Sequence, residues 1–281
     1  MLSERRATVR IWVNGRLADA AEATVSVLDH GMTVGDGVFE TVKAVDGRPF
    51  ALRRHLDRLE RSARGLGLPS PDRAEVEAAC AAVLEANPVA LGRLRITYTG
   101  GVAPLGSDRG DAPTTLVVAV GATPRRPDTA AVVTVPWTRN EHGATAGLKT
   151  TSYAENVVAL ARAHEYGASE AVLANTVGRL CEGTGSNVFV VVGGRLLTPP
   201  LTSGCLAGVT RALVLQWTDA EEADLPYSVL EEAEEVFLTG TLRDVQAISR
   251  IDQRELPGAP GPVTAKVMEI FADRAAADLE P

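Results

Sequence analysis

The chain has 281 residues, of which 45% are hydrophobic and 23% are charged, and its formal net charge at pH 7 is −8. This composition is that of a globular protein and excludes disordered and fibrous classes, and the length allows one large domain or two ordinary ones. The acidic balance argues against a nucleic-acid partner, because such a surface needs a local excess of Lys and Arg. No stretch is apolar enough for a membrane span, and the first residues lack the apolar core of a signal peptide, so a cytoplasmic location is expected.

The cysteine pattern indicates no disulfide framework. Cys80, Cys181 and Cys205 are an odd number at wide spacings, without a CxxC pair, and the chain has few histidines to complete a metal site. We therefore expect reduced thiols and no bound metal.

The first part of the chain predicts a meander of strands followed by two helices. Alternation over Val9–Val13, followed by Asn14-Gly15, is typical of a strand that enters a hairpin turn, and Val38–Val45 continues in β-like fashion. A helix is predicted next, and Gly67 is well placed as its C-terminal cap. Its apolar residues at helical spacing are Leu52, Leu56, Leu59, Ala63 and Leu66. The pattern over Pro69–Ala86 predicts a second helix.

Strands and helices then alternate to the end of the chain. Leu94–Thr99 and Thr115–Val120 are typical of buried strands on either side of a Gly-rich loop, and Ala122–Asp128 is the best linker candidate. Further strands are expected at Ala131–Val135, Glu170–Leu173, Asn187–Val192, Glu235–Leu238 and Val245–Ile251, and helices at Tyr153–Tyr166, at Ala207–Trp217 and from Val263. The expected fold class is α+β, without internal repeats, in an N-terminal lobe 1–123 and a C-terminal lobe 124–281.

An anion site is expected where the helix Ala207–Trp217 begins. Gly208, Val209 and Thr210 open this helix, and free backbone N–H groups with the helix dipole favour a phosphate there. The hydroxyl of Thr210 can add one more donor. Taken alone, however, Gly-Val-Thr before an apolar helix is usually only a helix start.

Four motifs along the chain resemble those of one enzyme family. They are Gly35-Asp36-Gly37-Val38-Phe39-Glu40-Thr41, then His55-Leu56-Asp57-Arg58-Leu59, then Leu148-Lys149-Thr150-Thr151-Ser152-Tyr153 with Glu155-Asn156, and finally Glu182-Gly183-Thr184-Gly185-Ser186-Asn187-Val188-Phe189 with Leu196-Leu197-Thr198-Pro199-Pro200 and Leu206-Ala207-Gly208-Val209-Thr210-Arg211. Together they are similar to the class IV aminotransferases, the fold-type IV pyridoxal-phosphate enzymes. The resemblance implies the cofactor pyridoxal 5'-phosphate, a small N-terminal α/β lobe, a larger C-terminal lobe with a barrel-like sheet that carries the Schiff-base lysine, a cofactor between the lobes, and a homodimer.

The resemblance also implies roles for individual residues. Lys149 would hold the cofactor aldehyde as a Schiff base and then remove a proton from the substrate, and Glu182 would keep the pyridine nitrogen protonated. Further implied cofactor-binding residues are Arg58, Tyr153, Ser186, Asn187, Gly208, Val209, Thr210 and Thr241, with Arg58 and Thr241 on the phosphate. By pattern alone, Lys149 and Arg58 are solvated charges, Glu182 and Thr241 are turn residues, and neither His30 nor His55 is assigned a proton-transfer role.

The substrate is expected to contact the N-terminal lobe. Phe39 and Thr41 lie in the first motif, which is similar to that of the lyase and D-amino-acid branches of the family, since Val34 stands where branched-chain aminotransferases tend to have an aromatic residue. Arg95 and Arg109 are two cations that suit a dicarboxylate, and aminodeoxychorismate carries two carboxylates. The alternative for both arginines is a surface charge on a strand end or loop.

These residues favour one reaction and leave two alternatives. The favoured one is a 4-amino-4-deoxychorismate lyase, which eliminates pyruvate and gives 4-aminobenzoate for folate synthesis. The first alternative is an aminotransferase for D-amino acids or branched-chain amino acids, because the fate of the proton on Lys149 is open. A distant alternative is a non-catalytic pyridoxal-phosphate-binding protein, although such a protein has no use for both Lys149 and Glu182. In every case the expected ligand is a small molecule with amine and carboxylate groups.

Overall fold

The structure is a computed structural model that describes residues 9–281, and these residues form two compact units. Unit 1 comprises 9–125, Leu148–Ser152 and Glu280, and unit 2 comprises Arg126–Gly147, Tyr153–Leu279 and Pro281. We expected a boundary after residue 123 and the lysine segment in the C-terminal lobe. The segment Leu148–Ser152 belongs to unit 1 instead, because its backbone pairs with a strand of that unit.

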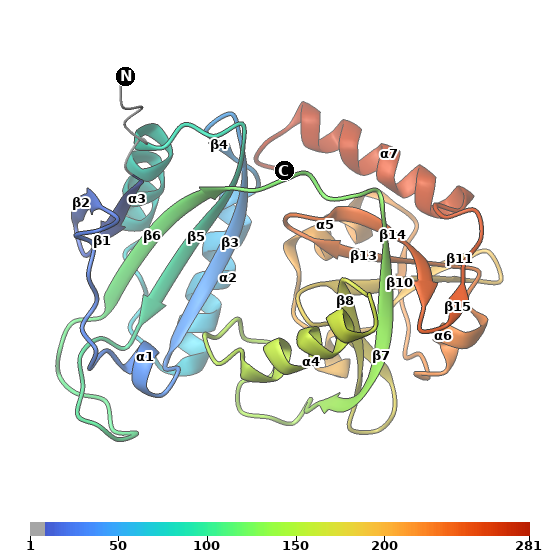
Figure 1. The fold of residues 1–281 in the computed structure, drawn as a ribbon, viewed down its shortest axis with the longest axis horizontal. Coiled ribbons are helices and arrows are strands. Elements are labelled where there is room, and N and C mark those ends of the chain that lie inside the picture. Colours follow the sequence, from blue (N-terminus) through green and yellow to red (C-terminus); the bar gives the residue numbers. More distant parts are fainter. Residues whose placement is uncertain (1–8) are drawn as a thin grey trace, which may run out of the picture. The chain divides into compact units, whose positions relative to one another are not determined.

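Unit 1 is built on a six-stranded antiparallel sheet in the order β2-β1-β6-β5-β3-β4. Its strands are β1 (Arg10–Val13), β2 (Arg16–Asp19), β3 (Gly37–Val45), β4 (Arg48–Pro49), β5 (Leu91–Thr99) and β6 (Thr115–Ala122), and its helices are α1 (His30–Thr33), α2 (Leu52–Leu66) and α3 (Arg73–Ala86). Helices α2 and α3 cover one face of the sheet (Figure 1). The predicted stop at Gly67 is confirmed, because this residue caps α2 with a φ of 77° that favours glycine.

The two faces of β3 serve different purposes. Val38, Val42 and Ala44 point into the core beneath the helices, where they join a cluster with α2 and α3. Since side chains alternate along a strand, Phe39 and Thr41 lie on the opposite face. The face of the sheet away from the helices therefore carries the residues that the sequence associates with substrate.

The segment Leu148–Ser152 extends the edge of β3. The amide of Phe39 donates to the carbonyl of Lys149 at 3.0 Å, the amide of Thr151 donates to the carbonyl of Gly37 at 2.8 Å, and Val38 and Thr150 form an antiparallel bridge. Unit 1 thus holds the backbone of Lys149 in the manner of a short additional strand.

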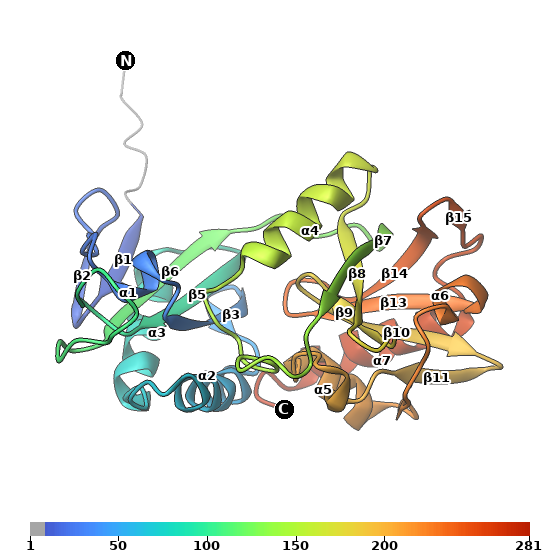
Figure 2. The same cartoon turned by 90° about the horizontal axis from the view of Figure 1, so that it is seen from below.

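Unit 2 contains a nine-stranded mixed sheet, which curls as a half-barrel (Figure 2). Its path is β12-β11-β10-β13-β14-β7-β8-β9, with β15 paired to β14. The strands are β7 (Thr129–Arg139), β8 (Glu170–Asn175), β9 (Leu180–Gly183), β10 (Asn187–Val192), β11 (Arg195–Thr198), β12 (Glu221–Glu222), β13 (Glu235–Gly240), β14 (Asp244–Ile251) and β15 (Arg254–Glu255), and the helices are α4 (Ala154–Glu165), the 3₁₀ turn Leu201–Ser203, α5 (Val209–Trp217), α6 (Val229–Glu232) and α7 (Pro262–Ala277). Helix α7 packs on β14 and α5. The α+β class is confirmed.

Two broad properties of residues 9–281 bear on function. None of the described helices has the length and apolar character needed to cross a membrane. Within the same range, no three His, Cys, Asp or Glu side chains gather in a way that could hold a metal ion. The three cysteines are buried free thiols.

Candidate active site

In unit 1, Lys149 is half-buried and its backbone is held from two directions. Its carbonyl accepts from Phe39 as described above, and its amide donates to the hydroxyl of Ser62 on α2 at 3.2 Å. The preceding Leu148 packs against Gly65 of α2, where a Cβ atom would come within 2.7 Å of the leucine side chain. These contacts fix the point from which the lysine side chain extends.

The ring of Phe39 brings Lys149 and Arg95 together. The Nζ atom of Lys149 lies 4.3 Å from the ring centroid, and the Cζ atom of Arg95 lies 3.4 Å from the same centroid. Both distances are typical of cation–π contacts. Since they share the centroid, the two cationic groups are no more than about 8 Å apart. Thr41 faces Arg95 across the ladder between β3 and β5.

Arg58 lies on α2 and is bound to a fully buried carboxylate. Its Nε and Nη2 atoms donate to the two oxygens of Glu40, each at 2.7 Å, and Nδ1 of His55 lies 2.7 Å from the second oxygen. Burial by itself raises the pKa of Glu40, but Arg58 and His55 outweigh it and hold that pKa well below its usual range. Burial lowers the pKa of His55, so the imidazole is neutral at pH 7. The trio fixes the guanidinium of Arg58, whose predicted partner is the cofactor phosphate.

Arg109 is fully engaged with unit 1 itself. Its guanidinium forms a two-pronged ion pair with Asp36, with distances of 2.6 and 2.7 Å, and it donates to the carbonyls of Leu66 and Gly67 at 2.7 Å. The ion pair lowers the pKa of Asp36. These contacts anchor the loop between β5 and β6 to the end of α2. We expected Arg109 to bind substrate; the structure places its guanidinium in this anchor, and a contact with substrate stays a prediction.

In unit 2, the carboxylate of Glu182 has a defined orientation at β9. One oxygen lies 3.1 Å from Nε of Arg139, and the other accepts from the backbone amide of Leu206 at 2.9 Å. Glu182 is only 8% exposed. A buried carboxylate with a cationic partner is suited to a second positive group such as a protonated ring nitrogen.

The start of α5 lies beside the Glu182 motif. Asn187 donates from Nδ2 to the carbonyl of Leu206 at 2.8 Å, and a Cβ atom on Gly208 would overlap with Oδ1 of Asn187. Gly208 is the N-cap residue, and it provides no side-chain cap for Val209 and Thr210. The helix start is therefore suited to an anion, because its first N–H groups lack an intrahelical partner.

Thr241 and Ser186 lie on neighbouring turns of unit 2. Thr241 follows β13, whose Thr239 pairs with Asn187 on β10, and Gly240 lies opposite Gly185 and Ser186. The Ser186 hydroxyl donates to buried Glu170 at 3.3 Å. Tyr153 is half-buried and forms the N-cap position of α4 in the same unit. The predicted residues of unit 2 thus include a carboxylate for the ring nitrogen and a cradle for the phosphate, so they fit pyridoxal phosphate.

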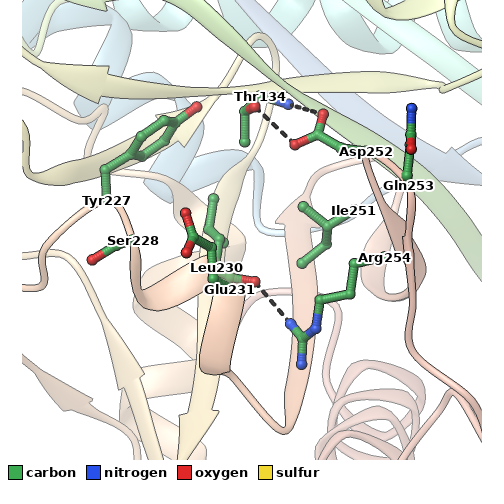
Figure 3. Close-up of a pocket in the computed structure, with 9 residues that line it drawn as sticks. All are labelled: Thr134, Tyr227, Ser228, Leu230, Glu231, Ile251, Asp252, Gln253 and Arg254. Carbon is green, nitrogen blue, oxygen red and sulfur yellow. Dashed lines mark hydrogen bonds between the residues drawn. The ribbon is translucent and has the colours of Figure 1, made fainter.

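A pocket of about 380 Å³ lies elsewhere in unit 2 (Figure 3). Along its wall the amide and hydroxyl of Thr134 each donate to Asp252 at 2.8 Å, and Arg254 donates to the carbonyl of Leu230 at 2.8 Å. None of the predicted site residues lines it. It is therefore not the candidate site.

Sequence reasoning missed the partners of the predicted residues. Arg139 holds Glu182, Glu40 holds Arg58, and Glu170 holds Ser186. Glu40 stood inside a recognised motif, and its charge between the core residues Val38 and Val42 of the strand was a usable signal. Arg139 and Glu170 lie far from their partners in the sequence, and no local pattern indicates them.

Comparisons with known proteins bear on the family of the chain. A family model described as amino-transferase class IV matches residues 37–251. A protein of Methanocaldococcus jannaschii named "Putative branched-chain-amino-acid aminotransferase" is 34% identical over 276 residues, which cover 94% of this chain and 96% of that protein. The D-alanine aminotransferase of Bacillus licheniformis is 31% identical over 274 residues, with coverage of 92% and 94%. A solved structure described as a hypothetical aminotransferase from Mycobacterium tuberculosis, PLP-bound form, has a TM-score of 0.84 at 27% identity, with coverage of 96% and 99%.

The family match spans most of the chain. It contains all four motifs apart from Gly35 and Asp36 at the start of the first one. The fit of Glu182 and of the α5 start to the cofactor is consistent with the same assignment. The chain therefore belongs to the class IV aminotransferase family and is a pyridoxal-phosphate enzyme.

Proposed function

We propose that this enzyme is an aminotransferase whose substrate is an amino acid with one recognised α-carboxylate. The observation that carries the proposal is the pair of cations around Phe39, because Arg95 can bind a carboxylate while Lys149 reaches the carbon that bears the amine. Cζ of Arg95 and Nζ of Lys149 are no more than about 8 Å apart, which suits a substrate whose amine and carboxylate are attached to the same carbon. Relatives named for D-alanine and branched-chain substrates support the same reaction type.

The residues of the chain would divide the work as follows. When bound, pyridoxal phosphate supplies an electron-withdrawing ring that stabilises negative charge on the amine-bearing carbon. Nζ of Lys149 would take the proton from that carbon and, in a transamination, would deliver it to the carbon that derives from the cofactor's aldehyde. Glu182, oriented by Arg139 and by the Leu206 amide, keeps a proton on the ring nitrogen. Arg58 and the start of α5 would bind the phosphate.

The lyase reaction is the second candidate. The sequence favoured the lyase because Arg95 and Arg109 could bind the two carboxylates of aminodeoxychorismate. In the structure, however, the guanidinium of Arg109 binds Asp36 and two backbone carbonyls. One observation still favours it. Arg93 lies two residues from Arg95 on β5, hence on the same face of the sheet, and could bind a second carboxylate.

One set of assays separates the two reactions. The purified holoenzyme is incubated with D-alanine or L-leucine and a 2-keto acid acceptor, and separately with aminodeoxychorismate. We expect a new keto acid and a new amino acid in the first case. Pyruvate and 4-aminobenzoate from aminodeoxychorismate, without transfer between amino acid and keto acid, would reverse the ranking. Lys149→Ala is the inactive control, and borohydride reduction with peptide mapping should label Lys149.

We also propose that the enzyme is a cytoplasmic homodimer. The support for a dimer is a group of exposed apolar side chains on unit 1, namely Val27, Met32 and Leu105, which are 72%, 73% and 79% exposed. Their segments lie side by side, because the amide of His30 donates to the carbonyl of Gly101. Such a group is typical of a protein contact. The three free thiols suit a reducing compartment.

A further inference from the structure

The turn that carries the cofactor motif of unit 2 closes around one buried carboxylate. Glu170 is the first residue of β8 and is 2% exposed. Its Oε1 accepts from the hydroxyl of Thr184, and its Oε2 accepts from the hydroxyl of Ser186 at 3.3 Å. The backbone of Gly185 also bonds to it. Three consecutive residues between Gly183 and Asn187 therefore donate to the same side chain.

A buried arginine links this carboxylate to a second turn. Nη2 of Arg243 lies 2.8 Å from Oε2 of Glu170 and also donates to the carbonyl of Ser169 at 3.2 Å. Another donor of Arg243 binds Gln246, whose amide group donates to the carbonyl of Pro127 at 2.6 Å. Arg243 closes the turn between β13 and β14, since its amide donates to the carbonyl of Gly240 at 2.9 Å. That turn carries Thr241.

The packing leaves little room for an alternative arrangement. A Cβ atom on Gly183 would overlap with the hydroxyl of Ser186 and would lie 3.2 Å from Cγ of Glu170. Burial raises the pKa of Glu170, and the charge of Arg243 opposes this. Removing either partner would leave the other as a buried group without its counterpart, which is the costly case for an ion pair.

We infer that Glu170 and Arg243 are positioning residues that hold the Gly183–Asn187 turn and the Thr241 turn in the arrangement that binds the cofactor. The inference rests on the proposed role of Ser186, Asn187 and Thr241 in that binding. Neither Glu170 nor Arg243 needs to touch the cofactor, because each acts through the turn it holds. Outer partners of this kind change ligand affinity by about 10- to 100-fold at metal sites, and we expect a loss of about tenfold or more here.

The test compares cofactor affinity with stability. Apoenzyme of the wild type and of Glu170→Gln is titrated with pyridoxal phosphate, and thermal unfolding of the apoenzyme is recorded in parallel. The glutamine keeps the shape of the side chain but turns an N–H group toward donors. We expect at least about tenfold weaker cofactor binding for Glu170→Gln. Arg243→Gln should behave alike, and the double variant should bind no more weakly than either single variant, because the two residues act as one unit.

Asp252→Asn is the matched control, since Asp252 also holds a turn of unit 2 through Thr134 but lines a pocket that contains none of the predicted cofactor residues. It should lower the unfolding temperature and leave cofactor affinity unchanged. Thr184→Val removes one hydrogen bond to Glu170 and replaces Glu170→Gln in the test if that variant does not fold. We expect this variant, too, to bind the cofactor more weakly than the wild type. Unchanged affinity in a folded variant, or an equal loss in Asp252→Asn, overturns the inference. If the wild type itself does not bind the cofactor, the proposed function fails instead.

Discussion

Glu40 shows how a charged residue becomes part of a core. The side chain is inaccessible to solvent, yet Arg58 and His55 supply three donors, each at 2.7 Å, and the carboxylate stays ionised. Such a pair adds little net stability over an apolar core, but breaking it is expensive. Its value lies in the fixed orientation of Arg58.

Glu40→Gln should therefore destabilise the enzyme strongly, because it leaves the guanidinium of Arg58 buried without a counter-charge. We expect the free energy of unfolding to fall by about 3–5 kcal/mol, measured by urea titration of the apoenzyme. Glu77→Gln is the control, since Glu77 forms an exposed pair with Arg73 and should cost less than about 1 kcal/mol. Equal effects of the two variants would contradict this role of Glu40.

His55 should make stability depend on pH. Its pKa is lowered in the folded enzyme by burial, so below about pH 6.5 the unfolded chain binds a proton that the folded enzyme does not. The free energy of unfolding should then decrease as pH falls from 7 toward 5, with a slope of at most about 1.4 kcal/mol per pH unit from this group. His55→Asn, whose amide can still donate to Glu40, should show a shallower slope in urea titrations. An unchanged slope would refute the assignment.

Among the helices and strands, those with a strong local pattern were predictable from the sequence, and those defined by pairing with remote strands were not. The helices α2 and α5 and the strands β3 and β10 were predictable from apolar periodicity and from caps such as Gly67. The short strands β9 and β11 were not, because four residues carry too little periodic signal and their pairing partners are set by the sheet. The strand-like segment of Lys149 was missed for the same reason.

The start of α5 allows a sharp test with glycine. Gly208→Ala should displace Asn187, because the new Cβ atom would overlap with its Oδ1 atom. We expect a stability loss of about 1–3 kcal/mol together with weaker cofactor binding, measured by thermal unfolding and by titration. Gly121→Ala on β6 is the matched control, since nothing lies within 4 Å of the place that its new methyl group would take and Gly121 lies outside the predicted cofactor residues. It should leave both quantities nearly unchanged, and a similar loss in both variants would argue against a specific clash.

For the whole molecule, the sequence indicated the fold class and the family, and it supplied the residues that we propose to bind the cofactor. It did so through motifs whose residue types the chemistry requires, such as the lysine, the carboxylate and the glycine at a helix start. It did not indicate what binds those residues in turn. The commitment of Arg109 to Asp36 depends on two segments 73 positions apart meeting in space, and that contact changed the ranking of the two reactions.

The proposed dimer gives a prediction at the same scale. Met32→Glu combined with Leu105→Glu places charges on the exposed apolar group of unit 1, and a buried charge at an interface is unfavourable. We expect light scattering after size-exclusion chromatography to give the mass of two chains for the wild type and of one chain for the variant. The control is Val177→Glu, a 68% exposed position in unit 2. A wild type with the mass of one chain would reject the proposal.

The assignment of Leu148–Ser152 to unit 1 affects how unit 1 can be expressed as a separate fragment. A fragment that stops at residue 125 would lack this segment, and the amide of Phe39 and the carbonyl of Gly37 on β3 would lose these backbone partners. An open strand edge promotes aggregation. Independent expression of the first unit would require these five residues to be grafted back, for example through a designed linker or as an added peptide.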